Sequence, residues 1–197
     1  MRFNLLIAVF SFLLLGSCNN ESKEKELLVN YEDESNELFD FEAISLAPYQ
    51  INALIYLPDE TADIGAATEP KIIHELNDYR WDILLGQYFH MRIVDYGEGD
   101  GIAIHLEELE ELSYMYDIEY IERKADFIYY KRTLKPRGSD EAAETVGVEH
   151  VTYHCLANHR IGGINYIFRS NNDGLSKPIA KYMVKSIRSV EEIKPEI

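Results

Sequence analysis

Three histidines and a cysteine, side chains that commonly bind metal ions, lie close together in the last quarter of the chain: His150, His154, Cys155 and His159. Imidazole and thiolate groups are ligands that Zn²⁺ prefers. The residues from Val151 to Tyr153 favour a strand, in which positions four apart are separated by about 13 Å. His150 and His154 could then not share one ion, and Cys155 would point away from His154. We therefore expect ordinary sheet histidines, a small buried thiol, and no metal or cofactor.

Catalysis by Cys155 would need a lowered thiol pKa and a general base within hydrogen-bond reach. The alternating apolar residues from Val151 to Ala157 argue for burial of this thiol instead. The serine hydrolase pattern GxSxG is absent. His74-Glu75 does not complete the metalloprotease pattern HExxH, because Asp78 stands where the second histidine would be. We assign no catalytic residue from the sequence.

Two acidic segments could attract cations. Glu107, Glu108, Glu110 and Glu111 diverge around a predicted helix, whereas a calcium site needs several oxygens that converge. We interpret them as a solvated face that could also meet a basic partner. The loop Gly97–Gly101 has a GxGxG pattern without nucleotide-binding spacing, and its two acidic residues would repel phosphate.

Five tyrosines lie close in sequence and could form an exposed surface for a glycan or a peptide. They are Tyr114, Tyr116, Tyr120, Tyr129 and Tyr130. The alternative is that they line a small core. We favour the core, because a sequence pattern alone does not show exposure.

Apolar periodicity predicts the elements that must position these residues. Alternation with period two predicts strands from about Leu38 to Ala43 and at Ile118–Arg123 and Phe127–Thr133. Further strands are predicted at Tyr49–Leu57, which is apolar, and at Lys71–Leu76, Trp81–Tyr96, Val146–Asn158 and Ile161–Arg169. Helical spacing predicts helices at Ile102–Tyr116 and Ser176–Val190. We expect the long strand to bend at Gly86, and the last hairpin to turn at His159-Arg160 and Gly162-Gly163.

Hairpins imply an antiparallel sheet, and both amphipathic helices must cover apolar sheet surface. The fold class is therefore α+β. The order of elements resembles the PsbP-like fold in outline, through the apolar segment Tyr49–Pro58 and the closing hairpin and helix from Val148 to Val190. No functional residue of that family can be transferred, because no specific motif is shared.

Composition narrows the class of protein further. The chain has 197 residues, with 35 acidic and 19 basic side chains and a formal charge of -16. Its 46% hydrophobic content excludes disorder throughout. The strong negative charge argues against nucleic-acid binding, because phosphates would be repelled.

The N-terminus carries the most specific signal. Arg2 precedes the apolar run Leu5–Leu15, which has the length of a secretory hydrophobic region and is too short to span a bilayer. Leu15-Gly16-Ser17-Cys18 resembles the lipobox of bacterial lipoproteins. The resemblance implies cleavage after Ser17, diacylglycerol on Cys18, and acylation (palmitate or a similar chain) of the new amino group. More than one acyl chain would make membrane anchoring stable.

These signals define three predicted segments: a signal peptide at 1–17, a lipidated acidic tether at 18–37 and one α+β domain at 38–193. Cleavage removes Arg2, which leaves 18 basic and 35 acidic side chains, a difference of -17. Once Cys18 carries lipid, only Cys155 remains as a thiol, so no intramolecular disulfide can form. We expect anchoring in the bacterial cell envelope, at the outer membrane in preference to the inner one, with the leaflet left open.

We predict a non-catalytic binding or accessory module with an envelope protein partner. The alternative is a small envelope hydrolase whose site is built from residues distant in sequence; a purely structural envelope protein is a third. A deep polar pocket with histidine or acidic residues of shifted pKa would favour the enzyme. A shallow apolar patch would favour the binding module.

Overall fold

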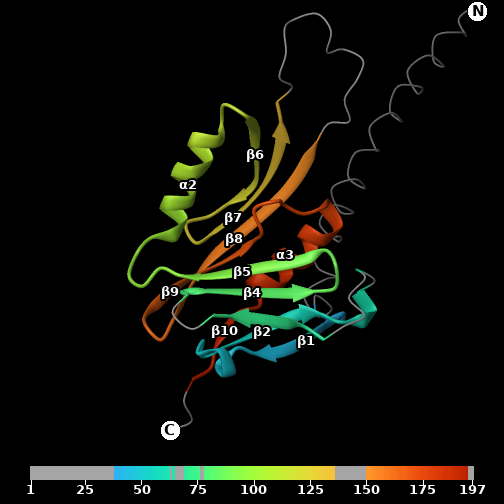
Figure 1. Ribbon diagram of the computed structural model, residues 1–197, viewed down its shortest axis with the longest axis vertical. Coiled ribbons are helices and arrows are strands. Elements are labelled where there is room, and N and C mark those ends of the chain that lie inside the picture. Colours follow the sequence, from blue (N-terminus) through green and yellow to red (C-terminus); the bar gives the residue numbers. More distant parts are fainter. Residues whose placement is uncertain (1–37, 63, 65–68, 76–77, 136–149, 195–197) are drawn as a thin grey trace, which may run out of the picture. The chain divides into compact units, whose positions relative to one another are not determined.

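The structure is a computed structural model that describes residues 38–62, 64, 69–75, 78–135 and 150–194 (Figure 1). The predicted signal peptide, Cys18 and the tether lie outside the described residues, as does Val146 at the predicted start of a strand. Contacts within the chain make Leu38–Ile197 a unit separate from residues 1–37.

The described part of this unit contains two antiparallel sheets. The larger sheet has the order β3-β4-β5-β9-β8-β7-β6. Its strands are β3 (Lys71–His74), β4 (Arg80–Leu85), β5 (Phe89–Asp95), β6 (Tyr116–Arg123), β7 (Phe127–Leu134), β8 (Val151–Ile161) and β9 (Ile164–Ser170). The smaller sheet has the order β1-β2-β10, from β1 (Phe41–Ser45), β2 (Ala53–Pro58) and β10 (Glu191–Glu192). The predicted α+β class with antiparallel pairing is confirmed, but a single sheet is wrong, because β2 pairs with β1 and β10.

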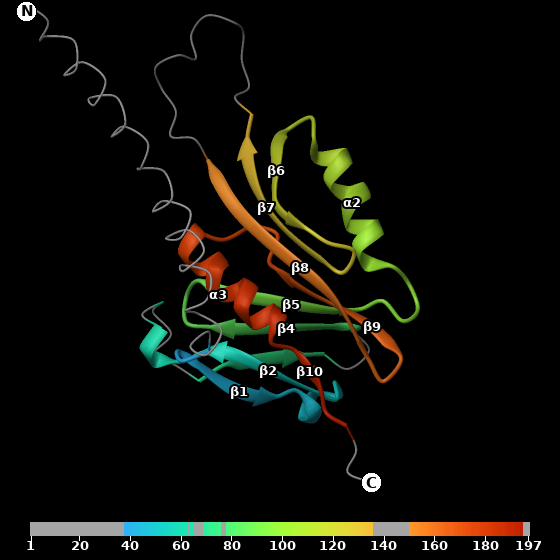
Figure 2. The same cartoon turned by 180° about the vertical axis from the view of Figure 1, so that it is seen from behind.

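Two helices pack on opposite faces of the larger sheet. Helix α3 (Lys177–Arg188) lies behind this sheet in Figure 1 and in front of it in Figure 2, while α2 (Gly101–Leu112) packs on the other face over β7, β8 and β9. Two short 3-10 helices, η1 (Ala47–Tyr49) and η2 (Glu60–Ala62), flank β2. The main core lies on the α3 side, where α3 and β2 meet the sheet.

Strand alternation separates an apolar face from a polar face. In β4, Trp81, Ile83 and Leu85 are buried in the main core, and the residues between them lie on the α2 side. In β5, Phe89, Met91 and Ile93 are buried in the same way. Because α2 packs toward the β7 to β9 side of the sheet, the α2-side face of β4 and β5 stays partly exposed and carries Asp82, His90 and Arg92.

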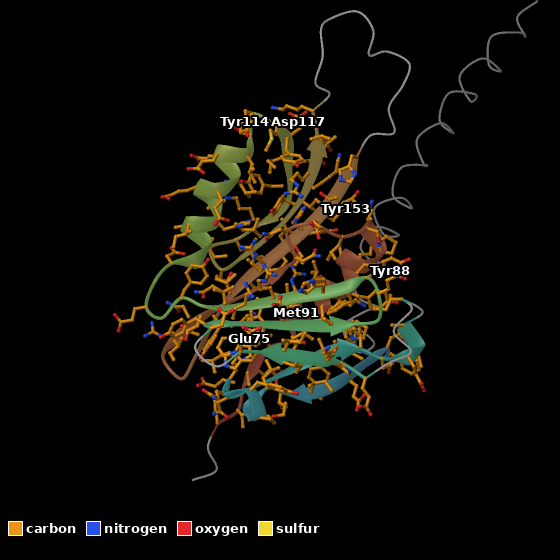
Figure 3. All side chains as sticks on the ribbon, viewed as in Figure 1. Glu75, Tyr88, Met91, Tyr114, Asp117 and Tyr153 are labelled. Atoms are coloured by element: carbon orange, nitrogen blue, oxygen red, sulfur yellow. The ribbon has the colours of Figure 1, made fainter. Side chains whose placement is uncertain are left out.

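The predicted strand Trp81–Tyr96 is wrong in one respect, because it is two strands and not one bent strand. Gly86 adopts a positive φ of 57°, which glycine tolerates without steric cost. The chain therefore reverses after Leu85, and β4 pairs with β5 as a hairpin. Figure 3 labels Tyr88 in this reversal and Met91 in the strand that follows.

The predicted helix Ile102–Tyr116 is too long at its C-terminal end. Helix α2 begins at Gly101, and its N-cap Asp100 accepts hydrogen bonds from the backbone N–H groups of Ile102 and Ala103 at 3.0 Å. It ends at Leu112, because Tyr116 is the first residue of β6 and pairs with Leu134. Tyr116 therefore belongs to the sheet and not to the helix.

The last hairpin and helix also differ from their predicted bounds. Gly162 and Gly163 alone form the turn, with φ of 59° and 87°, as a two-residue turn with two positive φ values requires. His159 and Arg160 lie inside β8. The predicted helix Ser176–Val190 is the shorter α3, Lys177–Arg188. Ser176 is its N-cap, with extended backbone and no hydrogen bond from its side chain to the helix.

The outer predicted strands are shorter in the structure. Tyr49 belongs to η1, so β2 starts at Ala53. Phe39 precedes β1 and is 76% exposed, so the alternation predicted from Leu38 becomes a strand only at Phe41.

Candidate functional site

A cavity of 160 Å³ lies between α2 and the face of the sheet that α2 covers. Strands β7 and β8, the end of β9 and the residues after it line the cavity together with α2. Its polar lining residues include His105 and Glu108 of α2, Tyr130 and Arg132 of β7, His154 of β8, and Arg169 of β9.

Antiparallel register explains why the strand residues meet. Tyr130 pairs with His154, and the neighbouring pair Arg132 and Thr152 lies two residues further along. Because positions two apart in a strand share a face, all four side chains lie on the α2 side. Arg169 pairs with Leu156 on the other edge of β8 and so joins the same face.

A chain of hydrogen bonds joins Glu108, His105 and Tyr130. The Glu108 carboxylate lies 3.2 Å from His105 Nδ1, and His105 Nε2 lies 3.2 Å from the Tyr130 hydroxyl. A carboxylate only accepts, so Nδ1 carries the proton and Nε2 of the neutral ring accepts from the tyrosine. Burial and the charge of Arg169 lower the pKa of His105. Burial raises the pKa of Tyr130.

His154 is the second buried imidazole of the cavity. Its ring stacks on Tyr130 with centroids 5.1 Å apart, and its Nε2 lies 3.0 Å from Thr152 Oγ1. Burial, followed by the positive charge of Arg132, lowers the pKa of His154 to about 3. Gly174 packs so closely that a Cβ there would lie 2.5 Å from His154 Nε2. Both histidines of the cavity are therefore uncharged at neutral pH.

Two arginines bring positive charge to this cavity. Arg132 Nη2 donates to the backbone carbonyl of Asn172 at 3.0 Å, and Arg169 donates to the side-chain oxygen of Asn172. Arg132 also lies over the Tyr116 ring, 4.6 Å from its centroid. Arg169 lies 4.0 Å from Glu108, which is half exposed.

The polar face continues from the cavity onto β4 and β5. Asp82 accepts from Arg92 Nε at 2.9 Å, lies 2.8 Å from His90 Nε2, and pairs with Arg80 at 3.3 Å. Burial raises the pKa of Asp82, but the hydrogen bonds from His90 and Arg92 outweigh it and lower this pKa overall. A shallow groove joins Arg80 and Arg92 to Arg169 at the rim of the cavity.

The residues considered as metal ligands are not brought together. His150 is exposed and precedes β8, and His154 lies on the α2 side. Cys155 and His159 lie on the α3 side, where His159 Nε2 donates to the Ile187 carbonyl at 2.8 Å. The predicted opposition of His154 and Cys155 is confirmed. Within the described ranges, no three His, Cys, Asp or Glu side chains could hold one metal ion.

Cys155 has the surroundings of a structural thiol. It is 1% exposed, in the main core. Burial raises the pKa of its thiol, which suppresses the thiolate needed for nucleophilic attack. The prediction of a small buried thiol is confirmed.

The tyrosines divide between the core and the surface. Tyr130 is buried, as predicted, but Tyr114 is 72% exposed in the connection between α2 and β6, near Asp117 (Figure 3). Tyr120 is also exposed. The four glutamates of α2 are exposed, and Glu108 differs from the others because it contacts His105.

Sequence reasoning missed His105, Arg132 and Arg169 as site residues. The signal that could have found Arg132 is its parity with Tyr130 in one strand, once β7 is paired with β8. His105 occupies a buried position of α2, between Ile102 and Leu109. A histidine in the apolar stripe of a helix requires a polar partner beneath it.

No family model matches the chain, and no curated protein matches it. Among solved structures, the chain is similar to the 1.9 Å crystal structure of the Ran-binding protein Mog1p from Saccharomyces cerevisiae. The identity is 11%, the coverage is 77% of this chain and 95% of that chain, and the TM-score is 0.43. A likeness of this size carries no information about the site.

Within the residues that the structure describes, no helix is both long and apolar enough to cross a membrane.

Proposed function

We propose that this protein is a lipid-anchored binding module of the bacterial cell envelope and that the cavity beneath α2 is its binding site. The lipobox Leu15-Gly16-Ser17-Cys18 motivates the anchor. The observation that carries the binding site is the convergence of Arg132, Arg169 and the neutral pair Tyr130 and His154 on one cavity. A small number of polar groups that converge on a concave site is typical of a ligand-binding site.

The cavity has polar lining residues and holds histidines of shifted pKa, two features that by themselves would favour an enzyme. The direction of these shifts favours binding instead. A general base works best with a pKa near the working pH, but the pKa of His154 falls to about 3 and that of His105 is also lowered. The raised pKa of Tyr130 keeps its hydroxyl protonated. These groups can donate or accept hydrogen bonds, yet they exchange protons poorly at neutral pH.

Lipid labelling tests the anchor. Cys18→Ala should abolish incorporation of labelled palmitate and membrane retention, because the thiol that receives the lipid is lost. Cys155→Ser is the matched control and should retain both. Labelling that persists in the Cys18→Ala chain would contradict the anchor.

Crosslinking in intact cells, followed by mass spectrometry of co-purified molecules, tests the cavity as a binding site. Leu112→Trp would fill the cavity from a half-buried position at the end of α2. Ile104→Trp is the matched control, because Ile104 is exposed on the same helix. We expect a molecule captured by the wild-type chain to be lost with Leu112→Trp and kept with Ile104→Trp. Equal capture by both variants would refute the cavity as the site.

One observation favours the second candidate, a small envelope hydrolase. Glu108, His105 and Tyr130 form a carboxylate–imidazole–hydroxyl chain with two contacts of 3.2 Å, the arrangement that orients a base toward a nucleophile. A panel of ester and phosphoester substrates tests it. Turnover that His105→Gln abolishes without unfolding the chain would establish the hydrolase and replace the non-catalytic proposal.

We further propose that the domain has the PsbP-like arrangement of layers. The support is that β2 ends at Pro58 and that the hairpin of β8 and β9 is followed by α3. Superposition of an experimental structure on a PsbP-like domain tests this assignment. A different strand order in the larger sheet would contradict it.

A further inference from the structure

Arg132 and Arg169 approach each other from strands on either side of β8. Both guanidinium groups donate to Asn172, one to its backbone carbonyl at 3.0 Å and the other to its side-chain oxygen. Both arginines also line the cavity. Asn172 therefore holds two positively charged guanidinium groups at the edge of the same cavity. Such an arrangement is unfavourable unless negative charge compensates it.

The described residues supply only part of that negative charge. Arg132 forms no ion pair with any described side chain, and its Nε is buried without a hydrogen-bond partner. Arg169 has Glu108 at 4.0 Å, but the same Glu108 oxygen also contacts His105. In a chain with a formal charge of -16, one half-exposed carboxylate, that of Glu108, is thus the described ion-pair partner for these two arginines, and it contacts Arg169. Buried donors without partners are rare in proteins and point to a missing acceptor.

Among the polar lining groups discussed above, the Glu108 carboxylate would compete with an anion for Arg169, whereas the histidines and Tyr130 would not. The buried rings of His105 and His154 are neutral, and Tyr130 keeps its proton. The side-chain oxygen of Asn171 is buried without a partner at the same place. Rotation of this amide by 180° would present its N–H groups instead.

The size of the cavity limits the ligand. Its volume of 160 Å³ is close to that of an engineered cavity that holds benzene, about 150 Å³. It suits one small group and is smaller than a site for a whole drug-sized molecule. The guanidinium fork matches carboxylate and phosphate oxygens in pairs.

We propose that the cavity beneath α2 binds one small oxyanion, the carboxylate or phosphate end of a ligand, through Arg132 and Arg169. This inference rests on the proposed role of the same cavity as a binding site. It adds the chemical class of the ligand and the two residues that recognise it.

Titration of the full chain in detergent with inorganic phosphate or with acetate, at constant ionic strength, tests the proposal. We expect saturable binding of at least one anion by calorimetry. Arg132→Gln and Arg169→Gln should each weaken it at least about tenfold, as loss of a charge-assisted bond predicts. Arg160→Gln is the matched control, because Arg160 is exposed on β8 outside the cavity, and should bind like the wild type. Saturation by phosphate alone would assign a phosphate end, and by acetate alone a carboxylate end.

A measurement on the wild-type chain avoids variants that fail to fold. The Nε–H resonance of Arg132 should shift with the same saturation curve when the anion is added. No saturation by either anion, or equal weakening in all three arginine variants, would overturn the proposal.

The oxyanion site and the lipid-anchored binding module can be refuted independently of each other. Cys18→Ala should bind the anion like the wild type, because this change leaves Arg132 and Arg169 in place. If neither anion binds but Leu112→Trp still abolishes capture in cells, the oxyanion proposal fails and the binding module stands. If the anion binds but lipid labelling does not depend on Cys18, the anchor fails and the oxyanion site stands.

Discussion

The buried imidazole of His154 should make the stability of this protein depend on pH. Its pKa in the folded state is lowered to about 3, against about 6.5 in an unfolded chain. The unfolded state therefore takes up a proton first as the pH falls, so stability is present above about pH 6.5 and is lost progressively toward pH 3. Between pH 7 and pH 5 this single group should cost about 2 kcal/mol of unfolding free energy.

His154→Gln isolates that contribution. Glutamine does not titrate and can still offer a polar atom to Thr152, while the charged and titratable neighbours Arg132, Arg169 and His105 stay in place. Urea denaturation at pH 7, 6 and 5 would give the free energy of unfolding of both chains. We expect the wild type to lose about 2 kcal/mol more than the variant over this interval. Identical pH dependence in the two chains would refute a neutral His154 in the folded state.

Three further substitutions test the elements around the cavity. At Gly174, which has a φ of 79°, a new Cβ would lie 2.5 Å from His154 Nε2, whereas at Gly162 a new Cβ would meet no atom within 4 Å. Gly174→Ala should therefore destabilise the chain by at least about 1 kcal/mol more than Gly162→Ala. Equal urea midpoints for the two variants would refute the close packing at Gly174. Asp100→Ala should cost about 1 kcal/mol through loss of the N-cap, and Asp100→Asn should cost little; a full loss with asparagine would assign another role to Asp100. In a Cys18→Ala chain, Cys155 should react with a thiol reagent at least about 100-fold more slowly in the folded than in the denatured state. Comparable rates would show that Cys155 is accessible.

The fold class could be predicted because strand and helix periodicities depend on local burial. The paired strands near Ile118–Arg123 and Phe127–Thr133 agree with β6 and β7 to within two residues. The division of Trp81–Tyr96 into β4 and β5 was missed, because apolar residues continue on both sides of Gly86 with almost no polar interruption. The second sheet was missed for another reason. Its partners β2 and β10 are 133 or more residues apart, and pairing at that distance leaves no local pattern.

The candidate site could be predicted only in part. Burial of Cys155 and the opposite directions of His154 and Cys155 follow from strand alternation. The cavity does not, because its residues come from α2, β7, β8 and β9, and only strand register brings them together. Single-residue patterns also cannot show that Arg132 has no carboxylate partner among the described residues, since an ion pair depends on which side chains surround the charge.

The unequal burial of the two helices has a consequence for motion. Helix α3 contributes Ile179, Ala180, Met183 and Ile187 to the main core, whereas α2 contributes Ile102 and Leu109 to the smaller cluster. An element held by fewer apolar contacts detaches at a lower free energy than the rest of the domain. Backbone amides of α2 should therefore exchange with deuterium through local opening, while those of β4 and β5 should exchange only through global unfolding. Because α2 covers the cavity, the same local opening would set how fast a ligand enters and leaves.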